Sequence, residues 1–199
     1  MFRKYLLFRA DGYGKPPTDN QAGADKGGPQ LISMISIRKY NQDDAQAVGI
    51  LVADTYSEYN LSFAVPRELE KLLGPFWFAR SEEPEHQKAI EVVIEAKMVF
   101  VADDEGEVVG VLRGRKERLQ SLFVRADHHR TGIGSQLVER FEDECRRQGS
   151  RQIKVAATLY AVPFYSRIGY KKTTGLRPGW SFGGSGLVYQ PMKKVLVRG

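Results

Sequence analysis

The spacing of hydrophobic residues changes several times along this chain, and each spacing predicts a different element. Residues 35–38 alternate apolar and polar side chains, as a half-buried strand does. Asn41 and Asp44 stand three residues apart, as at a helix start, and apolar residues then recur at helical spacing from Val48 to Tyr59. Residues 66–73 read as a second helix, and a third begins at Pro84. The first half therefore predicts one strand followed by three helices.

The second half alternates short apolar runs with turns. Two runs, 98–102 and 108–112, flank an acidic turn that contains glycine and predict a β-hairpin. The remaining pattern predicts strands at 119–124, 153–159, 170–174 and 187–197, and helices from Gly132 to about Gln148 and over 163–168. The order β-α-α-α-β-β-β-α-β-α-β-β predicts an α/β fold, with a mixed sheet that carries helices on its faces.

The N-terminal part of the chain has a different composition. Residues 11–29 contain no branched aliphatic side chain, so they cannot bury enough apolar surface to offset their ordering entropy. We therefore expect residues 1–33 to be a disordered extension and residues 34–199 to form the domain, with Met34 as the natural first residue. Deleting residues 1–33 is then expected to leave the melting temperature and activity unchanged.

Composition narrows the class of protein. The 199 residues suffice for one domain, no apolar run approaches the roughly 20 residues of a membrane helix, and the apolar stretch near residue 6 is too short for a signal-peptide core. These features predict a cytoplasmic protein with no membrane partner. The single cysteine, Cys145, excludes an internal disulfide and is read as a buried apolar residue. The three histidines lack neighbouring ligands at metal spacing, so no metal site is expected.

Gly132 and Gly134 lie between the 119–124 strand and the helix that follows it. Glycines allow backbone amides to approach a ligand closely, and a helix start adds unpaired N–H groups, so this loop is suited to bind phosphate. It is neither a P-loop nor a dinucleotide fingerprint, because it lacks the Lys-Ser/Thr ending and the third glycine. The formal charge of +6 fits an anionic ligand. Basic residues flank the loop and favour the same reading: Arg113, Arg115, Lys116, Arg118, Arg125 and Arg130.

Three segments in this order resemble the GNAT acyltransferase superfamily over residues 35–196. Residues 122–134 look like the family's apolar strand, short loop and Gln/Arg-x-x-Gly-x-Gly/Ala pattern, with His129 in place of the Gln or Arg. Residues 161–170 resemble its Ala-x-x-Phe-Tyr-x-x-x-Gly-Phe segment, and residues 188–194 resemble its final strand. The resemblance implies a mixed, mostly antiparallel central sheet flanked by helices on both faces.

The resemblance also implies an N-acetyltransferase that uses acetyl-CoA. The acetyl group would pass to a primary amine of a small molecule or peptide by direct attack in a ternary complex. Tyr165 is the expected proton donor for the departing thiolate, because a phenol and a thiol have similar pKa values. The pantetheine arm is expected to pair with backbone groups of Phe123 and Val124. The cofactor-binding residues that the resemblance implies are Leu122, Phe123, Val124, His129, Arg130, Thr131, Gly132, Ile133, Gly134, Ser135, Thr158 and Phe164.

Several features stay open at this level. Glu117 and Glu58 are both possible general bases, and the acceptor would lie among aromatic residues: Tyr56, Tyr59, Phe63, Phe76, Trp77, Trp180 and Phe182. Of these, Phe76 and Trp77 are read as core. The alternatives are a non-catalytic module that binds acyl-CoA, and a basic protein that binds nucleic acid. Because no nucleic-acid motif is present, no nucleic-acid partner is expected. A homodimer is common among similar proteins.

Overall fold

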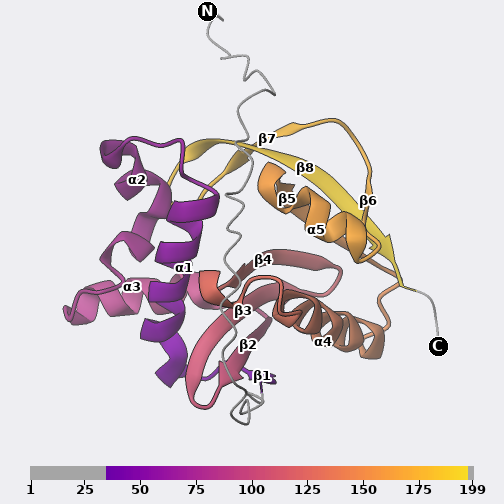
Figure 1. The fold of residues 1–199 in the computed structure, drawn as a ribbon, viewed down its shortest axis with the longest axis horizontal. Helices are drawn as coiled ribbons and strands as arrows, with labels where there is room; N and C mark the ends of the chain where they lie inside the picture. Colours follow the sequence, from indigo (N-terminus) through magenta and orange to yellow (C-terminus); the bar gives the residue numbers. More distant parts are fainter. Residues whose placement is uncertain (1–34, 197–199) are drawn as a thin grey trace, which may run out of the picture. The chain divides into compact units, whose positions relative to one another are not determined.

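The computed structural model describes residues 35–196, and the extension predicted for residues 1–33 lies outside this part. Figure 1 shows helices on both sides of a central sheet, with α1, α2 and α3 together on the left and α4 and α5 on the right. The helices are α1 (Ala45–Tyr59), α2 (Pro66–Leu73), α3 (Pro84–Ile94), α4 (Ile133–Arg147) and α5 (Val162–Arg167). The strands are β1 (Ser36–Lys39), β2 (Met98–Asp104), β3 (Glu107–Arg115), β4 (Arg118–Val124), β5 (Gln152–Thr158), β6 (Lys171–Lys172), β7 (Arg177–Trp180) and β8 (Ser185–Val195).

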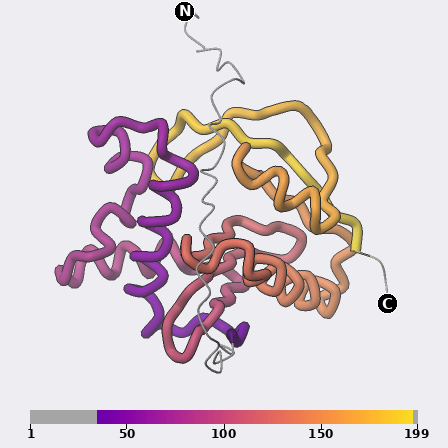
Figure 2. Tube along the Cα trace, in the orientation of Figure 1, coloured from indigo at the N-terminus to yellow at the C-terminus, as the bar shows by residue number. Residues whose placement is uncertain are grey.

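The strands form one eight-stranded sheet in the order β1-β2-β3-β4-β5-β8-β6, with β7 paired to β8. Among the described strands only β4 and β5 pair in parallel, and the other pairs are antiparallel. Segments far apart in the chain meet in this sheet, as Figure 2 shows for the indigo β1 beside the magenta β2. The predicted mixed, mostly antiparallel sheet with helices on both faces is confirmed.

Each face of the sheet has its own core. Leu137 and Phe141 of α4 pack on one face with apolar residues of β2 to β5, whereas Val48 and Val52 of α1 pack on the other face with α2 and α3. The first helical segment begins at the predicted cap: the backbone N–H of Asn41 donates to Asp44 Oδ2 at 2.8 Å, at the start of a 3₁₀ turn, Gln42–Asp44, that leads into α1. The packing of helices on both faces holds the ends of β4 and β5 in place, and the candidate site lies at these ends.

Two sequence expectations are corrected. Strand β7 has no counterpart in the sequence pattern, because Arg177-Pro178-Gly179-Trp180 has neither alternating apolar residues nor high strand propensity and pairs only through its contact with β8. The sequence predicts Trp77 as core, but it is 44% exposed, whereas its neighbour Phe76 is fully buried. Both residues lie in the short 3₁₀ turn Gly74–Phe78, whose three-residue period turns adjacent side chains to different sides.

Candidate active site

Strands β4 and β5 pair at one end and separate at the other. Their register contains only Arg118 with Lys154 and Leu119 with Val155, so the later residues of the two strands are not paired to each other. The separation begins at a bulge, because Arg113 of β3 faces Ser121 while Gly114 faces Leu119. A bulge bends its strand and ends regular pairing. The result is a fork that opens between the ends of β4 and β5.

The backbone of β4 offers free polar groups on the open side of this fork. The Arg125 amide donates to the Val109 carbonyl. In an antiparallel ladder, hydrogen-bonded and non-hydrogen-bonded pairs alternate, so Phe123 and Val111, two positions earlier, are also a hydrogen-bonded pair. The backbone N–H and carbonyl of Phe123 are therefore hydrogen-bonded to β3, whereas those of Leu122 and Val124 point toward the fork. The backbone pairing expected of Phe123 falls to Leu122, while the Phe123 ring packs against α1.

The loop before α4 forms a cradle of amide N–H groups. Within the described chain, the amides of residues 130–134 have no hydrogen-bond acceptor, whereas those of Ser135 and Gln136 donate to the Gly132 carbonyl at 3.0 and 3.1 Å. Arg130 has φ 66° and Gly132 has φ 93°, which turns successive amides toward one side. The cradle also stands at the positive end of the α4 dipole. Binding of a diphosphate here stays a prediction, and the amides free for it are those of residues 130–134, without the Ser135 amide of the predicted set.

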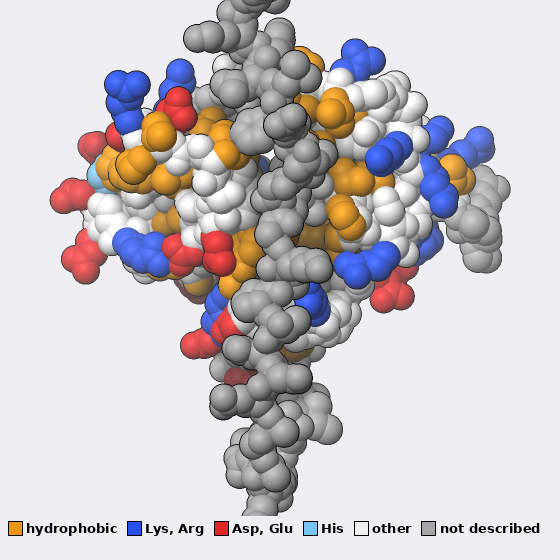
Figure 3. Space-filling model, turned by 45° about the horizontal axis from the view of Figure 1, so that its top comes forward, with side chains coloured by type: hydrophobic (Ala, Val, Ile, Leu, Met, Phe, Trp, Pro, Cys, Tyr) orange, Lys and Arg blue, Asp and Glu red, His pale blue; other side chains and the backbone are white. Residues whose placement is uncertain are grey.

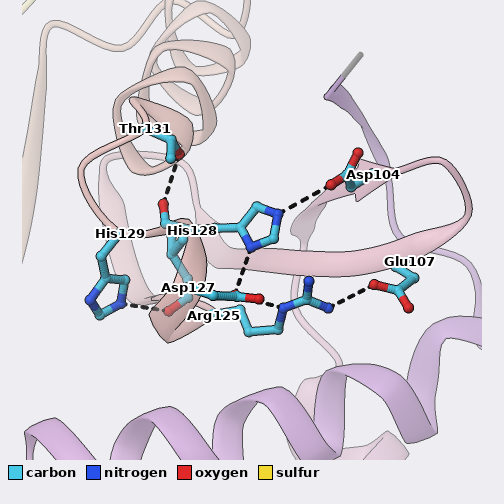
Figure 4. Close-up of polar contacts among 8 residues, drawn as sticks. Asp104, Glu107, Arg125, Asp127, His128, His129 and Thr131 are labelled. Carbon is cyan, nitrogen blue, oxygen red and sulfur yellow. Dashed lines mark hydrogen bonds and ion pairs between the residues drawn. The ribbon is translucent and has the colours of Figure 1, made fainter. Parts of the chain in front are cut away.

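His129 ties this cradle to the end of β4. Its Nε2–H donates to the Val124 carbonyl at 2.8 Å (Figure 4). Its ring centroid also lies 4.7 Å from that of Tyr59 at the end of α1. The sequence places His129 in the position that is Gln or Arg in the resembling family. The structure puts a side-chain donor there, so the residue positions the loop through its ring.

A second set of contacts braces the loop against the β2–β3 hairpin. Arg125 bridges Glu107 and Asp127 at 2.9 and 2.8 Å, and the His128 ring contacts Asp127 at 2.7 Å and Asp104 at 3.1 Å (Figure 4). Arg125 first and His128 second hold the pKa of Asp127 down at about 2. Burial lowers the pKa of His128, but hydrogen bonds to Asp127 and Asp104 outweigh it and leave the pKa raised. Sequence reasoning missed this network because its members come from three separate segments.

Phe164, in the middle of α5, stands beside the cradle. A Cβ placed on Gly134 would lie 3.4 Å from the Phe164 ring and 3.7 Å from Val124, so strand, cradle and α5 meet at this glycine. Thr158, at the end of β5, accepts a hydrogen bond from Asn60 Nδ2 at 2.8 Å, which joins the far arm of the fork to α1. The predicted residues Val124, Gly134, Phe164 and Thr158 are thus brought to the two arms of one fork.

Tyr165 is buried among aromatic rings. It is 4% exposed and packs edge-on against Phe164 and Tyr170, with ring centroids 5.1 and 5.4 Å away. Its hydroxyl makes no hydrogen bond to another described residue. Burial raises the pKa of this phenol above its ordinary value of about 10. The hydroxyl therefore stays protonated and is able to donate.

The basic residues that cluster in the sequence do not gather around the cradle. Arg113 is buried and donates to the Ile94 carbonyl at 2.9 Å, and burial lowers its pKa to about 10. Arg125 is ion-paired, and Arg118 lies at the opposite end of β4 from the cradle. Arg115 and Lys116 lie with Arg118 at the β3–β4 turn, so Arg130 alone of the predicted group is exposed in the cradle itself. The interpretation of these residues as one phosphate-binding cluster is therefore wrong, because strand alternation sends neighbours in sequence to different places.

The structure also shows which candidate general bases and acceptor-binding residues lie near the fork. Glu117 lies in the β3–β4 turn, at the closed end of the fork, which makes it unsuitable as a base. Glu58 lies near the end of α1, next to Tyr59, and remains a candidate. Tyr56 and Phe182 pack with Phe123 on the α1 side of the fork, with Tyr56–Phe123 centroids 5.6 Å apart. Trp180 and Phe63 are exposed, at 82% and 54%.

Metal-ligating side chains form no group among residues 35–196, and no helix in that range is long and apolar enough to cross a membrane. The surface is unevenly charged, and basic side chains predominate at the right of the molecule in Figure 3.

Comparison with known proteins identifies a family and several solved structures that are similar to this chain. The family model described as an acetyltransferase (GNAT) domain matches residues 74–196. No curated protein is significantly similar to the chain in sequence. Solved structures share the fold at low identity. The GCN5-related N-acetyltransferase from Rhodopseudomonas palustris is 18% identical, with a TM-score of 0.65 and coverage of 85% of this chain and 100% of that one.

Two further similar structures were solved with coenzyme A or acetyl-CoA bound. The PaiA N-acetyltransferase from Thermoplasma acidophilum, in complex with coenzyme A, is 14% identical with a TM-score of 0.61, covering 82% of this chain and 99% of that one. YncA from Salmonella typhimurium, solved with its cofactor acetyl-CoA, is 19% identical with a TM-score of 0.56, covering 84% of this chain and 96% of that one.

Proposed function

The chain belongs to the acetyltransferase (GNAT) domain family and is an acyltransferase, and from this premise we propose that it moves the acetyl group of acetyl-CoA to a primary amine of a small molecule or peptide. The transfer takes place by direct attack while both substrates are bound. One observation carries the proposal: the unpartnered amides of residues 130–134 stand beside the open edge of β4. Such an edge and such a cradle together suit a ligand that has an amide-bearing arm and a diphosphate.

The cofactor-binding residues divide into three groups in this proposal. The amides of residues 130–134 bind the diphosphate, and the exposed Arg130 side chain adds a positive charge. Leu122 and Val124 supply backbone groups to the pantetheine arm. Because the Val124 carbonyl already accepts from His129, the free groups are the Leu122 N–H and carbonyl and the Val124 N–H. Phe164 and Thr158 line the two sides of the fork.

Tyr165 acts as the general acid. The neutral amine attacks the thioester carbonyl, a C–N bond forms, the C–S bond breaks, and the sulfur takes the Tyr165 proton. A backbone N–H on the open edge of β4 stabilises the charge on the carbonyl oxygen. The ammonium proton leaves through water, and Tyr165 is reprotonated from solvent. Burial keeps the phenol protonated, and the same rise in pKa makes it a weaker acid toward a free thiolate, so the proton passes to the sulfur as the C–S bond breaks.

The experiment that tests the function measures thiol release from acetyl-CoA with a panel of amines. The panel contains small monoamines, polyamines, amino acids and short peptides with free N-termini. Acetyl transfer to any member, identified by mass spectrometry of the product, supports the proposal. Binding of acetyl-CoA without product from the panel favours a module that only binds acyl-CoA. Failure to bind acetyl-CoA contradicts both readings.

A further inference from the structure

A row of basic side chains crosses four neighbouring strands. Arg118 of β4 pairs with Lys154 of β5, Lys154 pairs with Lys193 of β8, and Lys193 pairs with Lys171 of β6. Residues that are directly opposite across strands lie on the same face of a sheet. Lys154 alternates with Val155, which is buried on the α4 side. The row therefore lies on the face that carries α1, α2 and α3, beyond those helices, and all four side chains are exposed.

Nothing in the described chain neutralises this row. None of the four side chains takes part in an ion pair or a side-chain hydrogen bond with another described residue. Like charges directly opposite each other destabilise a sheet. The arrangement thus lowers the stability of the protein alone, and an anionic ligand along the row would remove the repulsion.

Three members of the row, Arg118, Lys154 and Lys193, line a cavity that extends along the fork, and Lys171 lies at the end of the row beyond this lining. The cavity has a volume of about 490 Å³, and its polar lining consists of Arg118, Gln152, Lys154, Thr173, Tyr189 and Lys193, with no aspartate or glutamate. It begins where β4 and β5 still pair and reaches Tyr189, which is opposite Thr158 at the end of β5. A ligand in this cavity would therefore lie alongside the fork and approach its open end.

We propose that this cavity binds an acidic segment of a peptide acceptor, whose amine then reaches the open end of the fork. The inference rests on the proposed function and names its acceptor class. Three gaps between strands make the row about 14 Å long, which is about four residues of extended peptide. A single carboxylate would leave most of the row unpaired.

Two other occupants fit the cavity less well. A second copy of the chain, seated symmetrically on this face, would bring two basic rows against each other. Single-stranded nucleic acid is bound by grooves with several aromatic stacking platforms, and Tyr189 is the one aromatic residue in this lining.

The test uses the full-length protein and two fluorescent peptides with free N-terminal amines, one with four glutamates after the first residue and one with four glutamines. We expect the glutamate peptide to bind at least about tenfold more tightly at low salt, because several exposed ion pairs add up and salt screens them. The Lys154→Gln/Lys193→Gln variant should lose most of this preference. The Arg151→Gln/Lys172→Gln variant removes the same charge from positions outside the row and should retain it.

The outcomes are distinct. Equal binding of the two peptides, or an equal loss in both double variants, overturns the proposal. So does tighter binding of a single-stranded oligonucleotide than of the glutamate peptide at the same salt. Peptide binding does not require catalysis. The binding measurement therefore tests the role of the basic row even if no amine in the panel is acetylated. With an active enzyme, the Lys154→Gln/Lys193→Gln variant should raise KM for the glutamate peptide and leave turnover of a small uncharged amine unchanged.

Discussion

The Nε2–H of His129 donates to the backbone carbonyl of Val124 at 2.8 Å, and this bond joins the phosphate cradle to the last residue of β4. The cradle and the strand edge bind different parts of one ligand in the proposed function, so their relative position decides whether both are used together. A side chain within the loop thus sets the spacing between two backbone sites.

Replacing His129 tests this relationship. His129→Ala should raise the Kd for coenzyme A by about 2- to 10-fold, the value of one ordinary hydrogen bond. His129→Gln should restore most of the affinity, because its amide can donate to the same carbonyl. Isothermal titration calorimetry measures both. His86→Ala, on α3, is the control and should leave the affinity unchanged; equal affinity of His129→Ala and wild type would contradict the bridging role.

The glycines allow a comparison between binding and stability. Gly132 and Gly149 both have positive φ, 93° and 75°. A Cβ on Gly149 would have no heavy atom within 4 Å, and one on Gly132 would meet only Gln136 Nε2, at 3.9 Å. Gly132→Ala and Gly149→Ala should each lower the free energy of unfolding by about 1–2 kcal/mol through backbone strain. Only Gly132→Ala should also weaken coenzyme A binding, because its methyl group lies in the cradle. Urea unfolding and calorimetry separate the two effects, and similar affinities for the two variants would argue against the cradle.

Tyr165 and Tyr170 form a matched pair of buried phenols. Tyr165→Phe should lower kcat by at least about tenfold while the Kd for coenzyme A changes little, since general acids contribute about 10²- to 10⁴-fold. Tyr170→Phe should leave kcat unchanged, because its buried hydroxyl lies next to Glu142 of α4 and not in the fork. Steady-state kinetics at saturating acetyl-CoA measure the difference. Unchanged turnover in Tyr165→Phe would remove the assignment.

The pH dependence of turnover follows from the same residue. Burial raises the pKa of Tyr165, so its acid form persists throughout the range below its ordinary value of about 10. We expect no fall in kcat from loss of the acid up to about pH 10. A descending limb near pH 8 that disappears in Tyr165→Phe would contradict this expectation.

His128 should make stability depend on pH in the opposite direction from a carboxylate. Its pKa is raised in the folded state, because the bonds to Asp127 and Asp104 outweigh burial. Its contribution is therefore complete below the unfolded value of about 6.5 and is lost as the pH rises through the folded value. The loss of unfolding free energy in His128→Gln should be larger at pH 6 than at pH 8.5. The same comparison for His86→Gln, whose ring contacts Ser81 and Phe78 instead of carboxylates, is the control.

Local patterns in the sequence predict much of this fold. Apolar spacing indicates α1, α3 and the β2–β3 hairpin, and Asn41 with Asp44 marks the first helix start, since these signals come from residues close together in the chain. Gly132 and Gly134 indicate the cradle for the same reason, because a positive φ and a helix start are local properties. The chemistry expected at this loop thus depends on only a few consecutive residues.

What the sequence alone determined is therefore the order of the elements other than β7, the resemblance to one enzyme family and the location of the glycine loop before α4. Only the tertiary structure decided which backbone groups of β4 are free, that His129 bridges to Val124, and that Arg118, Lys154, Lys193 and Lys171 form one row. These features depend on strand register and on a bulge. Register joins residues far apart in the chain, and a shift of one position reverses which face every side chain occupies.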